Sequence, residues 1–267
     1  HTALWNHPCC LLPGIAEGRT SCLYQAGSGN GAGEMTTNLL EAKGVTKRFG
    51  GLIAVNQASM TVRRGEITGL IGPNGAGKTT FFNLLSGFMT PDEGDIRFKG
   101  QRLNGMRPSN ICKLGMTRTF QIVKPFPELS VLENVMIGAF NTTASTAKAR
   151  EIAYRVLDLV EYAEYAEYPA GARPVAGRKR IEVAKALATE PELLLLDEVL
   201  AGLTPTEMWG MIDVLGKVRD SGVTIVIVEH VMAVIMSLCD SIVVINHGEN
   251  IAFGTPDEIS NNSKVLE

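Results

Sequence analysis

The chain has 267 residues, 45% of them hydrophobic, and a formal net charge of −3 at pH 7. This length suits one large domain or two small ones, and the near-neutral charge gives no basic surface for nucleic acid, so we expect no nucleic-acid partner. The longest apolar stretch, residues 223–236, contains Glu229 and His230 and is too short to span lipid. If the protein works at a membrane, other chains must anchor it.

The first 34 residues show no sustained helical or strand period and close with a glycine-rich run at residues 27–33. We interpret residues 1–34 as a non-domain extension, disordered or not native, and residues 35–267 as the domain. A signal peptide is the alternative, and it is disfavoured because no long apolar core follows a basic end. The end at Glu267, inside an expected helix, leaves a truncated C-terminus open.

Within the domain, apolar runs and helical spacing alternate along the chain. We expect strands at 39–45, 58–62, 66–71, 95–98, 193–196, 223–228, 241–245 and 250–253, with a turn at 49–51. We expect helices after Gly77, around 130–162, and at 178–189, 205–219 and 231–238, with the Glu-Tyr-Ala repeat of 161–168 as a helix end. Strands that alternate with helices indicate an α/β fold with a parallel core.

A phosphate-binding loop stands between an expected strand and an expected helix. Its residues fill every fixed position of the pattern G-x-x-x-x-G-K-[ST]: Gly72, Pro73, Asn74, Gly75, Ala76, Gly77, Lys78 and Thr79. Glycines let backbone N–H groups turn toward phosphates, and the helix N-terminus adds favourable partial charge. We expect Lys78 to reach the β- and γ-phosphates of ATP, Thr79 to ligate Mg²⁺ and Thr80 to contact the nucleotide. The alternative is a glycine-rich turn without a ligand.

Polar residues follow two of the apolar strands. Asp197 and Glu198 end the run Leu193–Leu196, where Asp197 would orient Mg²⁺ and Glu198 would accept a proton from the attacking water. His230 follows the next strand and could donate a hydrogen bond to the γ-phosphate, because α/β ligands collect at this edge. The alternatives are two solvated acids at a strand end and an ordinary surface or core histidine.

Together these motifs resemble the ATP-binding cassette (ABC) family over about residues 38–260. The resemblance implies a P-loop NTPase core with an N-terminal antiparallel β subdomain and a helical subdomain near 125–190. It also implies that two subunits close head to tail over ATP. Gln121, in Thr119-Phe120-Gln121, would contact Mg²⁺ and the lytic water, and Phe49 would stack against adenine. The alternatives are a surface glutamine and a core phenylalanine.

Four segments resemble the ATP-binding subunits of branched-chain amino acid transporters: residues 47–51, 82–87, 118–121 and 197–205. This implies an ATP-hydrolysing importer subunit, peripheral at the cytoplasmic face of the inner (plasma) membrane. Its partners would be a second, related ABC ATPase subunit, two permeases and a periplasmic binding protein. The alternatives are ATPases for urea or lipopolysaccharide, a soluble cassette ATPase of translation or DNA repair, and a non-hydrolysing regulatory subunit.

Two positions depart from the family pattern. The segment Arg173–Arg178 lacks the serine that would bind a γ-phosphate across the dimer, and leaves Gly177 and the following helix N-terminus as phosphate contacts. Thr204 stands where many members have aspartate. Both segments act on the partner's site in the family, so the departures bear on that site more than on this chain's own.

Overall fold

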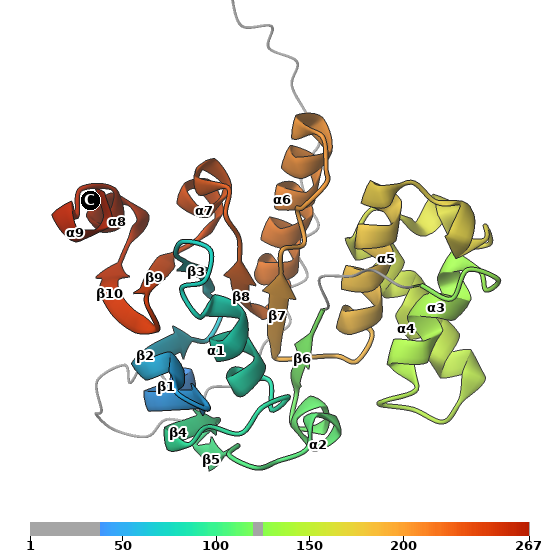
Figure 1. The fold of residues 1–267 in the computed structure, drawn as a ribbon. Coiled ribbons are helices and arrows are strands. Elements are labelled where there is room, and N and C mark those ends of the chain that lie inside the picture. The colour runs from blue at the N-terminus through green and yellow to red at the C-terminus, as the bar shows by residue number, and fades with distance from the viewer. Residues whose placement is uncertain (1–37, 120–124, 267) are drawn as a thin grey trace, which may run out of the picture. The chain divides into compact units, whose positions relative to one another are not determined.

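The structure is a computed structural model that describes residues 38–119 and 125–266 (Figure 1). The expected extension at 1–34 and Gln121 lie outside the described residues. None of the helices in the described part of the chain is long and apolar enough to cross a membrane.

An antiparallel sheet precedes and follows the phosphate loop in sequence. Its strands are β1 (Asn38–Phe49), β2 (Leu52–Arg63), β4 (Glu93–Phe98) and β5 (Gln101–Arg102), in the order β2-β1-β4-β5. Phe49 pairs with Leu52 across the turn, and Gly50 there has a φ of 57°, a left-handed conformation that glycine adopts without strain. The expected turn at 49–51 is confirmed, and β1 and β2 extend further toward it than the apolar pattern alone indicates.

A second sheet has six strands. They are β3 (Ile67–Ile71), β6 (Met116–Arg118), β7 (Leu193–Asp197), β8 (Thr224–Val228), β9 (Ser241–Asn246) and β10 (Glu249–Gly254), in the order β10-β9-β3-β8-β7-β6. Neighbouring strands pair in parallel except β9 and β10, which are antiparallel. Every residue of β3, β7 and β8 is buried. Their continuous apolar runs therefore reflect parallel strands covered on both faces, as the sequence predicts.

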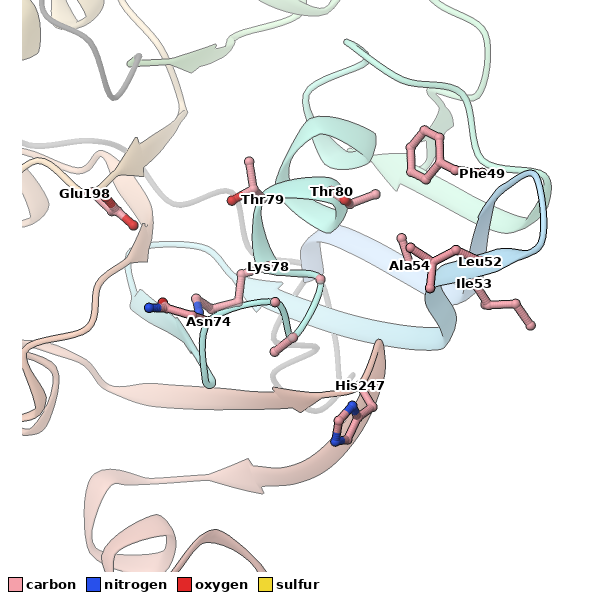
Figure 2. Close-up of a pocket in the computed structure, with 13 residues that line it drawn as sticks. Phe49, Leu52, Ile53, Ala54, Asn74, Lys78, Thr79, Thr80, Glu198 and His247 are labelled. Atoms are coloured by element: carbon pink, nitrogen blue, oxygen red, sulfur yellow. The ribbon is translucent and has the colours of Figure 1, made fainter.

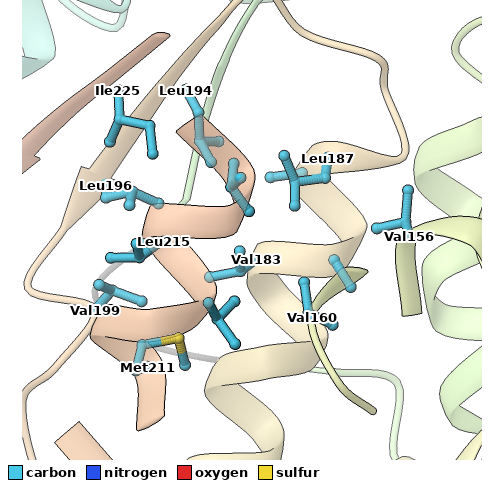
Figure 3. Packing of buried hydrophobic residues seen from close by; sticks show 14 of the residues in the cluster. Val156, Val160, Val183, Leu187, Leu194, Leu196, Val199, Met211, Leu215 and Ile225 are labelled. Atoms are coloured by element: carbon cyan, nitrogen blue, oxygen red, sulfur yellow. The ribbon is translucent and has the colours of Figure 1, made fainter. Parts of the chain in front are cut away.

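Alternate residues of the parallel strands face two separate cores. Leu193 and Leu195 pack in one cluster with the antiparallel sheet and helix α1 (Lys78–Leu85). Leu194 and Leu196 pack in the other, together with the helices on the opposite face (Figure 3). This alternation follows from the two-residue period of a strand. Helix α1 packs in the first cluster with residues of both sheets.

The remaining helices vary in length. They are α2 (Pro108–Lys113), α3 (Val131–Ala139), α4 (Thr146–Leu159), α5 (Val175–Leu187), α6 (Pro205–Asp220), α7 (Met232–Leu238), α8 (Pro256–Ser260) and α9 (Ser263–Leu266), with 3-10 turns at 163–165 and 170–172. In Figure 1, α3, α4 and α5 lie together beside the six-stranded sheet. All three fall within the range in which the helical subdomain is expected.

The structure corrects two expectations between residues 130 and 168. The helical region at 130–162 is two helices, since Ser130 caps α3 in a capping box with Glu133 and Ser145 caps α4. The repeat at 161–168 is not a helix end. Helix α4 stops at Leu159, Glu161 has a φ of 54°, and a short 3-10 turn follows.

Candidate functional site

The phosphate loop joins β3 to α1, and two of its glycines are fixed by close backbone neighbours. Gly77, the N-cap of α1, has a φ of 95°, and a Cβ there would overlap the carbonyl oxygen of Ala54. A Cβ at Gly72 would overlap the carbonyl oxygen of Ile245. The loop therefore packs closely between the backbones of β2 and β9, and the N–H groups at the α1 N-terminus are left to bind a ligand.

Lys78 is held inside the loop. Its ammonium nitrogen donates to the carbonyl oxygens of Gly72 (2.6 Å) and Pro73 (2.8 Å). Burial lowers the pKa of Lys78, and the charge of Glu198 opposes this shift. The cation thus lies at the loop, where it could contact phosphates that the backbone N–H groups would bind.

An open cavity of about 470 Å³ surrounds the loop (Figure 2). It is lined by residues 74–80 of the loop and α1, by Glu198, by His247 and by the hairpin residues Phe49, Leu52, Ile53 and Ala54. Phe49, Leu52 and Ile53 are all exposed although they are large and apolar. An exposed apolar surface beside a phosphate loop suits a flat aromatic base. The structure therefore brings Phe49 and the loop together, as the resemblance to the ABC family implies.

Glu198 enters this cavity from the end of β7, and Figure 2 shows its carboxylate directed toward the loop. Its backbone has a φ of 47°, which is uncommon for a residue other than glycine. Two bonds hold that conformation: the Glu198 N–H donates to the Val228 carbonyl (3.0 Å), and Lys179 donates to the Glu198 carbonyl (3.0 Å). The carboxylate is thus placed by a rigid turn.

Lys179, on α5, has only 5% of its surface exposed. Burial lowers its pKa, and the charges of Glu229, Glu198, Asp197 and Glu182 oppose that shift. The ammonium therefore sits among carboxylates and connects the start of α5 to the turn that carries Glu198.

Asp197 is 4% exposed and does not line the cavity directly. Its Oδ2 accepts from Nη2 of Arg118 at 2.7 Å, with both side chains buried. Within the described residues no group of three or more His, Cys, Asp or Glu side chains could hold a metal ion. One carboxylate and the Thr79 hydroxyl still fit Mg²⁺, which binds through few protein oxygens and keeps water and phosphate ligands.

Glu229 and His230 lie at the end of β8 in different surroundings. Glu229 is 1% exposed, accepts from the Leu200 N–H (2.8 Å), and has a pKa raised by burial. The His230 side chain is exposed and lines a neighbouring cavity of about 680 Å³ with Gly72 and Pro73. The structure thus places His230 beside the first loop residues but outside the cavity that contains Lys78 and Glu198.

The unusual segment Arg173–Arg178 forms the start of α5. The helix begins at Val175, three residues earlier than expected, with Pro174 as an N-cap that makes no side-chain hydrogen bond. Gly177 is buried, and a Cβ there would overlap the Tyr162 hydroxyl. Thr204 caps α6 in a capping box with Glu207. Local packing therefore explains why residue 177 is Gly177, and helix capping explains the presence of Thr204.

Four residues of this region had no role in the sequence-based expectation. Arg118 belongs to a quoted motif, and Lys179 is one of three consecutive basic residues, but neither pattern indicates burial against a carboxylate. Glu229 interrupts an apolar run, and this pattern alone indicates no role. His247 reaches the cavity because the Gly248 N–H bonds to Ala76, a contact between distant parts of the chain.

Comparison with known proteins decides the family. A profile of the ABC transporter family matches residues 55–201. The chain belongs to this family. Its nucleotide-binding ATPase fold, with an antiparallel subdomain beside the parallel core, is therefore confirmed.

Two relatives match over nearly their whole length. The high-affinity branched-chain amino acid transport ATP-binding protein BraF of Pseudomonas aeruginosa is 39% identical, over 87% of this chain and 98% of BraF. The protein of the same description named LivG in Escherichia coli K12 is 37% identical, over 87% of this chain and 97% of LivG.

Solved ABC cassettes share the fold. A nucleotide-free cassette has a TM-score of 0.79 and 29% identity, covering 86% of this chain and 98% of its own. A cassette in its ADP conformation has a TM-score of 0.79 and 28% identity over the same shares. Solved cassettes with this architecture thus include one without nucleotide and one in its ADP conformation.

Proposed function

We propose that this ABC ATPase powers an importer of branched-chain amino acids. The observation that carries the proposal is the cavity in which Glu198 faces Lys78 and Thr79, in a chain similar over nearly its full length to BraF and LivG. A rigid carboxylate opposite a phosphate loop suits activation of water against a γ-phosphate.

The residues of the site would divide the tasks of ATP hydrolysis among them. The loop N–H groups and Lys78 hold the phosphates, Phe49 stacks on adenine, and Glu198 accepts the proton of the attacking water. His230 and Gln121 would complete the site at the γ-phosphate. Thr79, Asp197 and Gln121 would hold Mg²⁺, which when bound neutralises phosphate charge.

Transport of a solute across a membrane requires other chains. A second, related ABC ATPase subunit would close head to tail against this one, and two permeases would receive the motion at the cytoplasmic face of the plasma membrane. A periplasmic binding protein would deliver the solute. BraF and LivG, named as transport ATP-binding proteins, support this assignment over a soluble cassette ATPase.

Reconstitution tests the substrate class. Proteoliposomes that contain this chain, a candidate second ATPase and the permeases encoded beside it should take up labelled leucine, isoleucine or valine in an ATP-dependent manner. Uptake should stop with Glu198→Gln. ATP-dependent transport of urea or lipopolysaccharide alone would overturn the substrate assignment, and absence of any association with permeases would overturn the transport role.

A further inference from the structure

Arg118 holds the Asp197 carboxylate from the neighbouring strand. Arg118 ends β6, and its backbone pairs with Leu195 of β7, two residues before Asp197. The guanidinium and carboxylate side chains are 9% and 5% exposed, and they meet at 2.7 Å. Loss of either partner of such a buried ion pair would leave the other charge uncompensated and poorly hydrated, which is costly.

The guanidinium is also fixed to helix α1, which follows the phosphate loop. Nη1 donates to the side-chain oxygen of Asn83 and to the Ser86 hydroxyl, the latter at 3.1 Å. The guanidinium carbon lies 4.8 Å from the centre of the Phe82 ring and 5.6 Å from that of Phe88. Arginine is well suited to this position because its flat group can stack on rings and donate several hydrogen bonds at once.

The positively charged Arg118 guanidinium thus contacts the Asp197 carboxylate, which the proposed function assigns to Mg²⁺. Two cations close to one carboxylate repel each other, and a partly desolvated site strengthens that repulsion. The guanidinium and the metal ion would therefore compete for the Asp197 carboxylate.

We propose that Arg118 is a positioning residue that holds Asp197 in the nucleotide-free site and competes with Mg²⁺ for it. The inference rests on the proposed function, since that function supplies the metal. Without nucleotide, the ion pair holds β6, β7 and α1 in their relative positions and neutralises the charge of the buried carboxylate. When the metal–nucleotide binds, the Arg118–Asp197 pair must weaken, which raises the Mg²⁺ concentration that binding requires.

The experiment measures nucleotide binding rather than turnover. Calorimetry with the β,γ-imido analogue of ATP gives the affinity in EDTA and at increasing Mg²⁺, and hence the Mg²⁺ concentration at half-effect. Arg118→Gln and Arg118→Met both remove the positive charge, the first with a polar side chain and the second with an apolar one. The test needs only one of the two variants to fold. Arg118→Lys keeps the charge. Arg155→Gln removes an exposed arginine paired with Glu190 and is the matched control.

Both neutral variants should lower the half-effect Mg²⁺ concentration by about tenfold, because a nearby positive charge is gone. Arg118→Lys should stay within about threefold of wild type and Arg155→Gln should match it. An unchanged or raised Mg²⁺ requirement in a folded neutral variant would overturn the competition, since a purely structural arginine changes stability without this shift. Failure of the nucleotide site that the proposed function assumes looks different, because wild type itself would then bind no nucleotide, and failure of the transport role would leave these binding results unchanged.

Discussion

The hydroxyl of Tyr162 fills the space beside the Cα of Gly177, where any larger residue would need a Cβ. Tyr162 is itself 6% exposed, so it has little room to withdraw. Gly177→Ala should therefore destabilise the protein by about 1–3 kcal/mol through overpacking. Thermal or denaturant unfolding measures the change.

The control for this substitution lies on another helix. Gly216, on α6, has nothing within 4 Å of its Cβ position, so Gly216→Ala should be neutral or stabilise by up to about 1 kcal/mol. Adding Tyr162→Phe to Gly177→Ala should recover part of the loss, since the overlapping oxygen is removed. A Gly177→Ala variant as stable as wild type would show that Tyr162 moves aside freely.

Lys78→Ala should weaken ATP binding by at least about a hundredfold, because charge-assisted bonds to two phosphates are lost. The ammonium lies at the loop, bonded to the carbonyl oxygens of Gly72 and Pro73, and is therefore near the expected phosphate position. Calorimetric titration with ATP gives the ratio. Lys113→Ala removes an exposed lysine of α2 and should bind ATP as wild type does. Equal affinity in Lys78→Ala would exclude this loop as the phosphate site.

Glu198→Gln should bind ATP with nearly wild-type affinity and hydrolyse it at least about a hundredfold more slowly, since an amide accepts no proton from water. The isosteric amide should preserve the turn that Val228 and Lys179 hold. Phosphate release under saturating ATP measures the rate. Turnover at the wild-type rate would mean that another residue is the base.

Lys179→Met tests whether the bond to the Glu198 carbonyl places the base. A displaced carboxylate should lower the maximal rate by about ten- to a hundredfold, while ATP affinity changes little. Lys179→Arg should recover part of the rate because it can still donate to that carbonyl. Lys185→Met, on the same helix but paired with Glu182, is the control and should keep the rate. Equal loss of affinity and rate in Lys179→Met would point to general disruption of the site.

These tests rest on features of different predictability. The phosphate loop, the buried strands before Gly72 and Asp197, and the turn after Phe49 follow from local patterns: glycine spacing, continuous apolar runs and a two-residue hairpin. Each depends on residues close in sequence, so one chain suffices to predict it. The start of α5 lies three residues before the expected position, because Pro174 gives no ordinary capping signal.

Contacts between distant segments were beyond sequence reasoning. Arg118 and Asp197 lie far apart in the chain, and only the parallel pairing of β6 with β7 brings them together. Lys179 reaches Glu198 because α5 packs beside the end of β7. Charge and burial of this kind depend on topology, which a motif does not encode. The roles of Gln121 and His230 stay predictions.

The last prediction concerns the cap that α5 offers to a partner subunit. In the proposed head-to-tail dimer, the start of α5 would face the γ-phosphate bound by the opposite chain. Pro174, the N-cap, provides neither a hydroxyl nor an N–H, and the cap makes no side-chain hydrogen bond. Loss of one hydrogen bond to a charged group costs about 1.5–3 kcal/mol, or about ten- to a hundredfold in the equilibrium.

A homodimer of this chain should therefore hydrolyse ATP slowly, because both sites receive the poor cap. Pairing with a related chain that carries a serine at this position should raise the rate by about tenfold or more at this chain's own phosphate loop. Lys78→Ala in this chain should abolish that gain. Pro174→Ser should raise the homodimer rate, whereas Pro108→Ser, at the start of α2, should not. A fast homodimer that gains nothing from the partner or from Pro174→Ser would show that the backbone N–H groups of α5 suffice, since they alone would then meet the γ-phosphate.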